Sequence, residues 1–166
     1  MRDDRNKWAS YEPSSTFRFG ETRLTPVDLS QQHIISGPAV LSQIDAPLVC
    51  WPDVASYAKY AVVLRRDRVL AVNGPARSEG WEEASCLAVS NANCLYSVFD
   101  LRGPDALSLL KRGTEISLAT RSKSSVRQIF GIETILYPIS ACGGFRLHVP
   151  RAYAAALMHQ LHTLAV

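Results

Sequence analysis

The sequence predicts an α+β fold made of two similar half-units, and three observations support this prediction. An apolar run, a Gly-Pro pair and a helix-like pattern occur together twice, at Gly37-Pro38 and at Gly103-Pro104, 66 positions apart (37 to 103). Stretches with the alternation of β-strands follow each pair. The final stretch, from residue 151 to the end, has helical spacing. We therefore expect duplicated strand-helix-hairpin-helix units with joined antiparallel or mixed sheets. The alternative is coincidence, because Gly-Pro is common where a strand leads into a helix.

Length and composition fit one folded domain. The chain has 166 residues, of which 47% are hydrophobic and 20% charged, as in ordinary globular proteins. No apolar run reaches the roughly 18 residues needed to cross a bilayer. The first ten residues, MRDDRNKWAS, lack the apolar core of a secretory signal. We therefore expect a cytoplasmic protein that does not bind a membrane.

The N-terminal residues 1–20 are expected to form an extended arm. They are polar and rich in turn-forming residues, yet they include four aromatic residues: Trp8, Tyr11, Phe17 and Phe19. Aromatic residues are rare in free tails, so this arm should dock on its own domain or on a neighbour. Residues 21–166 would then form a single domain, with halves at about 24–85 and 86–166.

In the first half, residues 33–45 predict a strand, a Gly-Pro junction and a helix. Residues 60–74, YAVVLRRDRVLAVNG, predict a hairpin with its turn at Arg66-Asp67. The following SEGWEEAS has an acidic first turn, which is typical of a short helix.

In the second half, strands are expected on both sides of residues 91–93, followed by a helix that Gly103-Pro104 opens and that runs to about Arg112. Two further strands, 128–139 and 145–150, should flank Gly143-Gly144. The apolar residues of FRLHV alternate with Arg146 and His148, which predicts a strand with one buried face. In the closing helix the expected buried stripe is Tyr153, Leu157, Leu161 and Leu164.

Gly103-Pro104 is better explained as a helix start than as a phosphate-binding turn. Gly103 is expected to supply a tight exit from the strand, Pro104 fits the first helical turn, and Asp105 complements the helix dipole. A proline also removes one N–H group that would bind a phosphate.

No residues in the sequence form a convincing catalytic or metal site. His159 and His162 are three apart on a helix but lack a third metal ligand. His33 and His148 could serve as general bases, yet no orienting carboxylate or nucleophile accompanies them. Structural histidines with satisfied hydrogen bonds are the better interpretation of both. GPARSEG (74–80) lacks the Lys-Ser/Thr ending of a phosphate loop, and ACGG (141–144) shows no neighbour that would activate its cysteine. We therefore predict no catalytic residues, no metal site and no bound cofactor, and we assign no cofactor-binding residues.

The cysteines and the charges suggest little chemistry. Cys50, Cys86, Cys94 and Cys142 are widely spaced, so we expect reduced thiols, several of them in the core. Net charge is +3, and residues 102–127 hold six cations: Arg102, Lys111, Arg112, Arg121, Lys123 and Arg127. This basic stretch could attract phosphates, polyanions or an acidic partner, or be a solvated surface. Nucleic acid is not expected as a partner, because no aromatic RNA-binding strand is present and LYSVFDL is typical of a buried central strand.

The second half resembles the gamma subunit of heterotetrameric sarcosine oxidase. The similar segments are LYSVFDLRGPDALSLLKRGTEISL and SSVRQIFGIETILYPISACGGFRLHVPRAYAAALMHQL, about residues 87–164. Residues 24–75 are similar to the family's first half more loosely. That family is a small relative of the aminomethyltransferase (glycine-cleavage T-protein) folate-binding fold, which implies the duplicated α+β architecture.

The resemblance also implies a function. The parent complex oxidises sarcosine, or a related N-methyl amine, and passes the one-carbon unit to tetrahydrofolate. Its FAD, FMN, NAD and folate are held mainly by larger flavoprotein subunits, which would be this chain's partners, and no family catalytic residue corresponds to a position here. Two alternatives remain: a free-standing folate-binding one-carbon protein, whose basic stretch receives the folate tail, or a small self-associating structural module that uses the aromatic arm.

Overall fold

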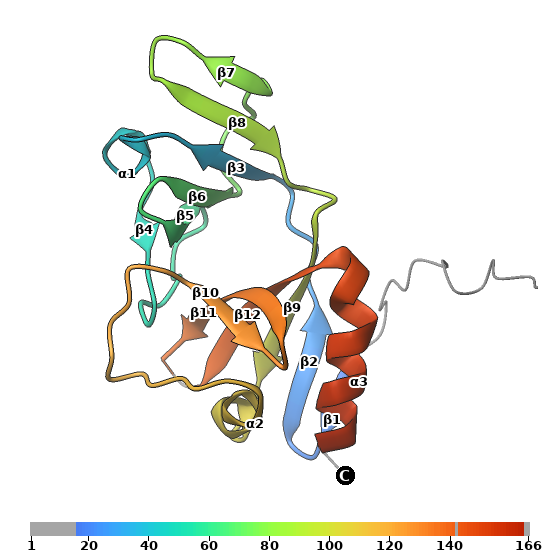
Figure 1. Cartoon of the computed structure of the whole chain (residues 1–166). Helices are drawn as coiled ribbons and strands as arrows, with labels where there is room; N and C mark the ends of the chain where they lie inside the picture. The colour runs from blue at the N-terminus through green and yellow to red at the C-terminus, as the bar shows by residue number, and fades with distance from the viewer. Residues whose placement is uncertain (1–15, 142, 165–166) are drawn as a thin grey trace, which may run out of the picture.

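The chain folds into two six-stranded, mostly antiparallel sheets with few helices, an α+β architecture (Figure 1). The computed structural model describes residues 16–141 and 143–164. Sheet A contains, in spatial order, β1 (Phe17–Phe19), β2 (Thr22–Pro26), β9 (Tyr96–Arg102), β12 (Gly144–Pro150), β11 (Ile132–Ser140) and β10 (Val126–Ile129). Sheet B contains β4 (Leu48–Val49), β5 (Tyr60–Arg65), β6 (Arg68–Val72), β3 (Gln32–Ser36), β8 (Leu87–Asn91) and β7 (Gly80–Glu82).

The two sheets arrange their strands alike. Sheet A has the order β1-β2-β9-β12-β11-β10, and sheet B read from its other edge has the order β7-β8-β3-β6-β5-β4. In sheet A the hairpin β1–β2 pairs through β2 with β9, and β9 pairs with β12, the second strand of the hairpin β11–β12. In sheet B the hairpin β7–β8 pairs through β8 with β3, and β3 pairs with β6, the second strand of the hairpin β5–β6. The hairpin β1–β2 precedes β3 in the chain but belongs to the sheet of β9, whereas β7–β8 precedes β9 but belongs to the sheet of β3.

Helices cover the face of sheet A that points away from sheet B (Figure 1). α2 (Ala106–Gly113) and α3 (Ala154–Leu164) pack there on Leu101 and Leu147, which are fully buried. Trp51, which follows β4 of sheet B, also enters this cluster and stacks on Phe145 at a centroid distance of 6.2 Å. The segment after β4 therefore ties sheet B to the core of sheet A.

The second face of sheet A lies against sheet B. Ile135 and Tyr137 from β11 share a buried cluster with Val62 and Leu70 from sheet B. As a result β12 is buried on both faces, and His148 has no exposed surface. The expectation of one solvent face for residues 145–149 is therefore wrong, because a strand pattern alone does not show that a second sheet covers the polar side.

The Gly103-Pro104 junction differs in detail from the expected helix start. The Ala106 N–H donates to the Gly103 carbonyl at 3.2 Å, so Pro104 lies within a turn and the helix begins two residues after it, at Ala106. Asp105 is the N-cap without a side-chain cap bond, and its own N–H donates to Thr22 Oγ1 at 3.1 Å. The tight exit at Gly103 is confirmed by its φ of 137°, and the helix ends at Gly113, one residue past the expected end.

Two other elements differ from prediction. The expected strand 128–139 is a hairpin, because Phe130 and Gly131 both have positive φ and turn the chain between β10 and β11. The SEGWEEAS segment forms the edge strand β7 rather than a helix, since Gly80–Glu82 pairs with β8. The predicted hairpin at 60–74 is confirmed, with its turn at Arg66-Asp67.

The C-terminal helix is confirmed with a shifted buried face. A 3-10 turn (Arg151–Tyr153) precedes α3, and Tyr153 is 56% exposed. The 3-10 turn and the helix have different periodicities, so Tyr153 falls outside the stripe. The buried residues of α3 are Ala154, Leu157, Met158 and Leu161. α1 (Val40–Gln43), after Gly37-Pro38, is a single short turn.

The predicted N-terminal arm lies only partly within the described residues. Of its aromatic residues, Phe19 is buried in the cluster beneath sheet A, and Phe17 packs against that cluster. Trp8 and Tyr11 lie outside the described residues. Among residues 16–141 and 143–164, no helix is long and apolar enough to cross a membrane.

Candidate functional site

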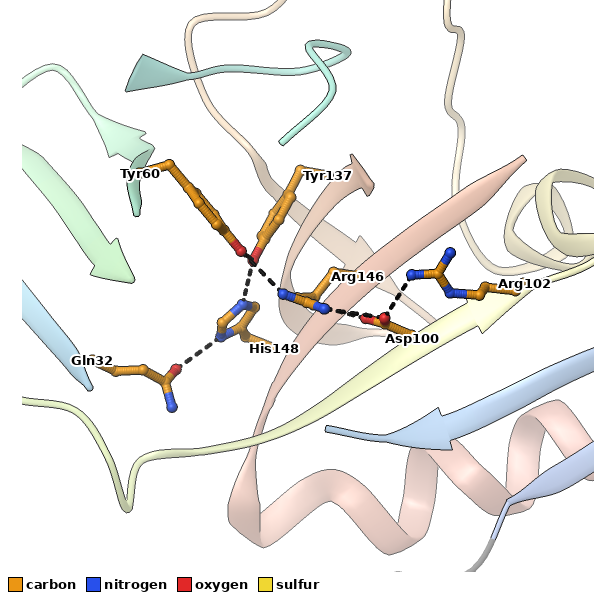
Figure 2. A network of polar contacts seen from close by, with 7 residues as sticks. All are labelled: Gln32, Tyr60, Asp100, Arg102, Tyr137, Arg146 and His148. Carbon is orange, nitrogen blue, oxygen red and sulfur yellow. Dashed lines mark hydrogen bonds and ion pairs between the residues drawn. The ribbon is translucent and has the colours of Figure 1, made fainter. Parts of the chain in front are cut away.

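A continuous chain of polar side chains joins the two sheets and ends at the surface of sheet A (Figure 2). Its members come from β3 and β5 of sheet B and from β9, β11 and β12 of sheet A: Gln32, Tyr60, Asp100, Arg102, Tyr137, Arg146 and His148. Below, this set is called the polar chain.

His148 is fully buried, as is Tyr137. Its Nε2 lies 2.7 Å from the Tyr137 hydroxyl, and its Nδ1 lies 3.1 Å from Gln32 Oε1. Burial, assisted by the nearby positive charge of Arg146, lowers the pKa of His148 to about 3, so the imidazole is neutral near neutral pH. Because Gln32 Oε1 can only accept, the Nδ1–H donates to it and Nε2 accepts from Tyr137.

The two tyrosines then have defined directions of donation. The Tyr137 and Tyr60 hydroxyls lie 2.9 Å apart, and Arg146 Nη1 donates to the Tyr60 hydroxyl at 3.2 Å. Since Tyr137 donates to His148, it accepts from Tyr60. Burial also raises the pKa of Tyr137 well above its ordinary value. The order of donation is therefore Arg146 to Tyr60, Tyr60 to Tyr137, Tyr137 to His148, and His148 to Gln32.

A bidentate ion pair anchors the other end of the polar chain. Arg146 Nε and Nη2 donate to the two carboxylate oxygens of Asp100 at 2.7 and 3.0 Å. Burial by itself lowers the pKa of Arg146, but the bonds to Asp100 outweigh it and the pKa is raised. Arg102 Nη2 adds a third bond to Asp100 at 3.1 Å. Paired guanidinium and carboxylate groups of this geometry are strong and directional.

The hydrogen bonds of the polar chain connect sheet A to sheet B. A general base must reach a proton on its substrate, but His148 and Tyr137 expose no surface and each polar atom already has a partner within the chain. The polar chain meets solvent at Arg102, which lies at the end of β9 and is exposed.

A pocket of about 380 Å³ opens at that end, between β1, β2 and β9. Val27 and six polar or charged residues line it: Arg18, Arg23, Arg102, Thr16, Thr25 and Asp100. We call it the arginine pocket. A larger hollow of about 650 Å³ lies beside Gly37-Pro38, next to the exposed Trp81.

The structure does not bring the four histidines together. His33 is buried in β3, where alternation directs it to the face opposite Gln32. His159 and His162 are exposed on α3, the helix that packs on the face of sheet A opposite sheet B. Within the described residues, no three His, Cys, Asp or Glu side chains lie where they could hold a metal ion.

The six cations of the basic stretch also separate. Arg102 pairs with Asp100 in the arginine pocket, whereas Arg112 Nη1 donates to a carbonyl at the end of α3 at 2.6 Å. Arg121 pairs with Asp53 at 2.6 Å, and Arg127 donates to backbone carbonyls near β10. A stretch that is continuous in sequence therefore contributes to different parts of the surface.

The cysteines within the described residues are free thiols, as expected, but they are not core residues. Cys86 and Cys94 are exposed, and Cys50 is half-buried. Burial, and then the negative charge of Asp53, raise the pKa of Cys50. Cys142, in the ACGG segment, lies outside the described residues.

Sequence reasoning missed the polar chain and the arginine pocket. Asp100 within the apolar run VFDL was one signal, because an acidic residue in a buried strand requires a partner. The partner residue, Arg146, is 46 positions away, and only strand pairing of β9 with β12 places the two opposite each other.

Comparison with known proteins identifies a shared fold. No model of a known protein family matches the chain, and no curated protein matches it. Among solved structures, it is similar to a chain of the heterotetrameric sarcosine oxidase from Corynebacterium sp. U-96 in complex with pyrrole 2-carboxylate. The TM-score is 0.63 at 14% sequence identity, over 98% of this chain and 92% of that chain. The two chains therefore have the same fold over almost their whole lengths.

Proposed function

We propose that this chain is a non-catalytic accessory subunit of a heteromeric flavoenzyme of the sarcosine oxidase type. The observation that carries the proposal is the shared fold with a chain of a heterotetrameric sarcosine oxidase, which extends over almost all of both chains. A common fold alone does not define a function. The resemblance of residues 87–164 to the gamma subunit family adds support in the second half of the chain.

The polar chain is consistent with such a supporting role. Its hydrogen bonds connect β-strands of one sheet to those of the other, and its central groups have their partners inside this chain. A rigid two-sheet body suits a subunit that packs against larger partners. In this proposal the larger flavoprotein subunits hold the flavins, NAD and tetrahydrofolate, and they oxidise sarcosine or a related N-methyl amine.

We also propose that the two halves, at about 24–85 and 86–166, arose by duplication. The equivalent strand orders of sheets A and B support a duplication in which β1–β6 correspond to β7–β12, which moves the proposed boundary to a position before β7. The pairing of β4 with β5 is parallel whereas β10 pairs antiparallel with β11, so the proposed halves have diverged at these edges.

Co-expression with the proteins encoded by the neighbouring genes tests the function. We expect a tagged full-length chain to copurify with a flavoprotein in fixed stoichiometry, with the visible absorbance of bound flavin and with sarcosine-dependent oxygen uptake. Dimethylglycine in place of sarcosine tests the wider class of N-methyl amines. A flavoprotein that purifies without this chain and is fully active and stable alone would contradict the proposal.

The folate-binding alternative has a narrower structural basis. Only Arg102 of the basic stretch lines the arginine pocket, so the six cations do not form one receptor for a folate tail. Calorimetry of the isolated chain with tetrahydrofolate tests this alternative directly, and no heat at high ligand concentration excludes it.

A further inference from the structure

Three arginines in the arginine pocket form a row of like charges across three neighbouring strands. Arg18 of β1 lies directly opposite Arg23 of β2, and Arg23 lies directly opposite Arg102 of β9. Residues directly opposite each other on antiparallel strands project from the same face, and like charges in these positions destabilise a sheet. The row therefore carries an energetic cost in the unliganded chain.

Carboxylates of the described residues pair with Arg102 of this row but not with Arg18 or Arg23. Asp100 is the acidic residue of the pocket lining, and Arg146 already binds both of its oxygens. Arg102 shares one of those oxygens, while Arg18 and Arg23 form no ion pair or hydrogen bond with any residue in 16–141 or 143–164. The exposed guanidinium groups of Arg18 and Arg23 are therefore available to bind a ligand.

The pocket is built on a fixed base. Asp100 and Arg146 connect it to the buried Tyr60 hydroxyl, so Arg102 is positioned by a carboxylate that is itself held at 2.7 and 3.0 Å (Figure 2). Thr25 lies opposite Asp100 in the strand register. Its hydroxyl, like that of Thr16, supplies a donor at the pocket wall.

We propose that the arginine pocket binds a small organic anion with two or more carboxylate or phosphate groups. Guanidinium groups present planar pairs of donors that match the oxygens of either group. A volume of about 380 Å³ lies within the range of small-molecule sites, roughly 300 to 1,000 Å³. The ligand would neutralise the repulsion between Arg18 and Arg23. This inference goes beyond the accessory role and does not depend on it.

Binding of two probe anions to the purified full-length chain tests the proposal. Citrate represents carboxylates and pyrophosphate represents phosphates, and each is titrated calorimetrically at an ionic strength held constant with sodium chloride. We expect saturable binding at one site for at least one probe, and the probe that binds more tightly identifies the anion class. Absence of saturable binding for both probes overturns the proposal.

Matched variants place the binding at the pocket. Arg23→Gln and Arg18→Gln should each weaken binding by about tenfold or more, because a charge-assisted hydrogen bond is lost. Arg65→Gln removes an exposed arginine outside the pocket lining and should leave the affinity unchanged. Equal affinities for Arg23→Gln and Arg65→Gln overturn the proposal.

Thermal unfolding without ligand provides a second readout. Arg23→Gln relieves like-charge repulsion on both sides, so its midpoint should equal or exceed that of the unmodified chain, although it binds the probe less tightly. A lowered midpoint would mean that Arg23 stabilises the sheet, and would contradict the proposal. Because the test concerns the isolated chain, its outcome is separate from copurification with a flavoprotein.

Discussion

Tyr137 is the residue on which the connection between the sheets depends. Its hydroxyl donates to His148 and accepts from Tyr60, and the side chain is fully buried. Each of these bonds crosses between strands, and the bond to Tyr60 crosses between sheets. A single oxygen atom therefore satisfies two other buried groups.

Removal of this oxygen should destabilise the fold. In Tyr137→Phe, the His148 Nε2 loses its donor and the Tyr60 hydroxyl loses its acceptor, so we expect a loss of roughly 1 to 3 kcal/mol in the free energy of unfolding. Urea unfolding followed by circular dichroism measures it. Tyr57→Phe, at a tyrosine that is 55% exposed, is the control and should change stability little. Equal effects of the two substitutions would show that the hydroxyl bonds contribute nothing.

His148 should make stability depend on pH in the acid range. Its pKa is about 3 in the folded chain and near the ordinary 6.5 when unfolded, so the unfolded state binds more protons between these values. Stability is therefore lost as the pH falls below 6.5. From pH 6 to pH 4 the loss assigned to His148 is roughly 2 to 3 kcal/mol.

His148→Gln is the matched comparison for this pH dependence. Glutamine can accept from Tyr137 and donate to Gln32, yet it does not titrate. Urea unfolding at a series of pH values should give a shallower slope for the variant than for the unmodified chain between pH 6 and pH 4. Parallel slopes would mean that His148 does not bind an extra proton on unfolding.

For individual residues, the sequence predicts backbone conformation better than it predicts hydrogen-bond partners. The sequence predicts a tight strand exit at Gly103, and its φ of 137° confirms this prediction. His148 was considered as a general base or as a satisfied structural residue, and its two hydrogen bonds confirm the second interpretation. Its partners Gln32 and Tyr137 could not be predicted, because they meet only after two sheets pack.

Among the secondary-structure elements, the junction between β9 and α2 leaves no room for a side chain at Gly103. At Gly103 a Cβ atom would lie 2.5 Å from the Thr22 Cα atom, in addition to the positive φ. Thr22 cannot move freely, since it is fully buried and its Oγ1 accepts from the Asp105 N–H. The turn from β9 into α2 and the strand β2 are thus packed directly on each other.

Gly103→Ala should therefore destabilise the chain by on the order of 3 kcal/mol, through backbone strain and overpacking together. Gly20→Ala is the control, because Gly20 also has positive φ, at 58°, but a Cβ atom there would meet nothing within 4 Å. Guanidinium unfolding of both variants measures the difference. If Gly20→Ala proved as costly as Gly103→Ala, the close approach to Thr22 would not be the cause.

The sequence predicts a hairpin correctly where polar turn residues separate two apolar strands. Arg66-Asp67 separates two apolar arms, and the turn was placed correctly. The turn at Phe130-Gly131 is not predicted, because Phe130 continues the apolar run, and the positive φ of Phe130 (50°) and of Gly131 (78°) shows the turn in the structure. The strand β7 was also missed, since an exposed edge strand lacks the alternation that a buried face imposes.

For the whole molecule, the two sheets share one interior. Ile135 and Tyr137 of sheet A pack with Val62 and Leu70 of sheet B, and the Ser125 N–H donates to the Val63 carbonyl at 2.9 Å. The sequence predicts joined sheets, whereas the structure has two separate six-stranded sheets that pack against each other. Pairing over long sequence separations, such as β2 with β9, depends on contacts that local patterns do not contain.

The position of the two hairpins means that neither half of the chain is self-sufficient. A cut after Ala76, in the exposed segment before β7, leaves β1–β2 on one fragment and their partner β9 on the other. The same cut separates β7–β8 from β3. Leu24 of β2, which is fully buried in the core between sheet A and its helices, would be exposed in the first fragment.

Fragments 1–76 and 77–166 should consequently assemble when they are co-expressed. We expect a one-to-one complex by size-exclusion chromatography with mass measurement, and cooperative unfolding of that complex, whereas each fragment alone should remain unfolded because a sheet edge and a buried strand are missing. Cooperative folding of 77–166 alone would contradict this expectation. In this expectation the exchanged hairpins, rather than the peptide bond between the fragments, hold the two parts of the chain together.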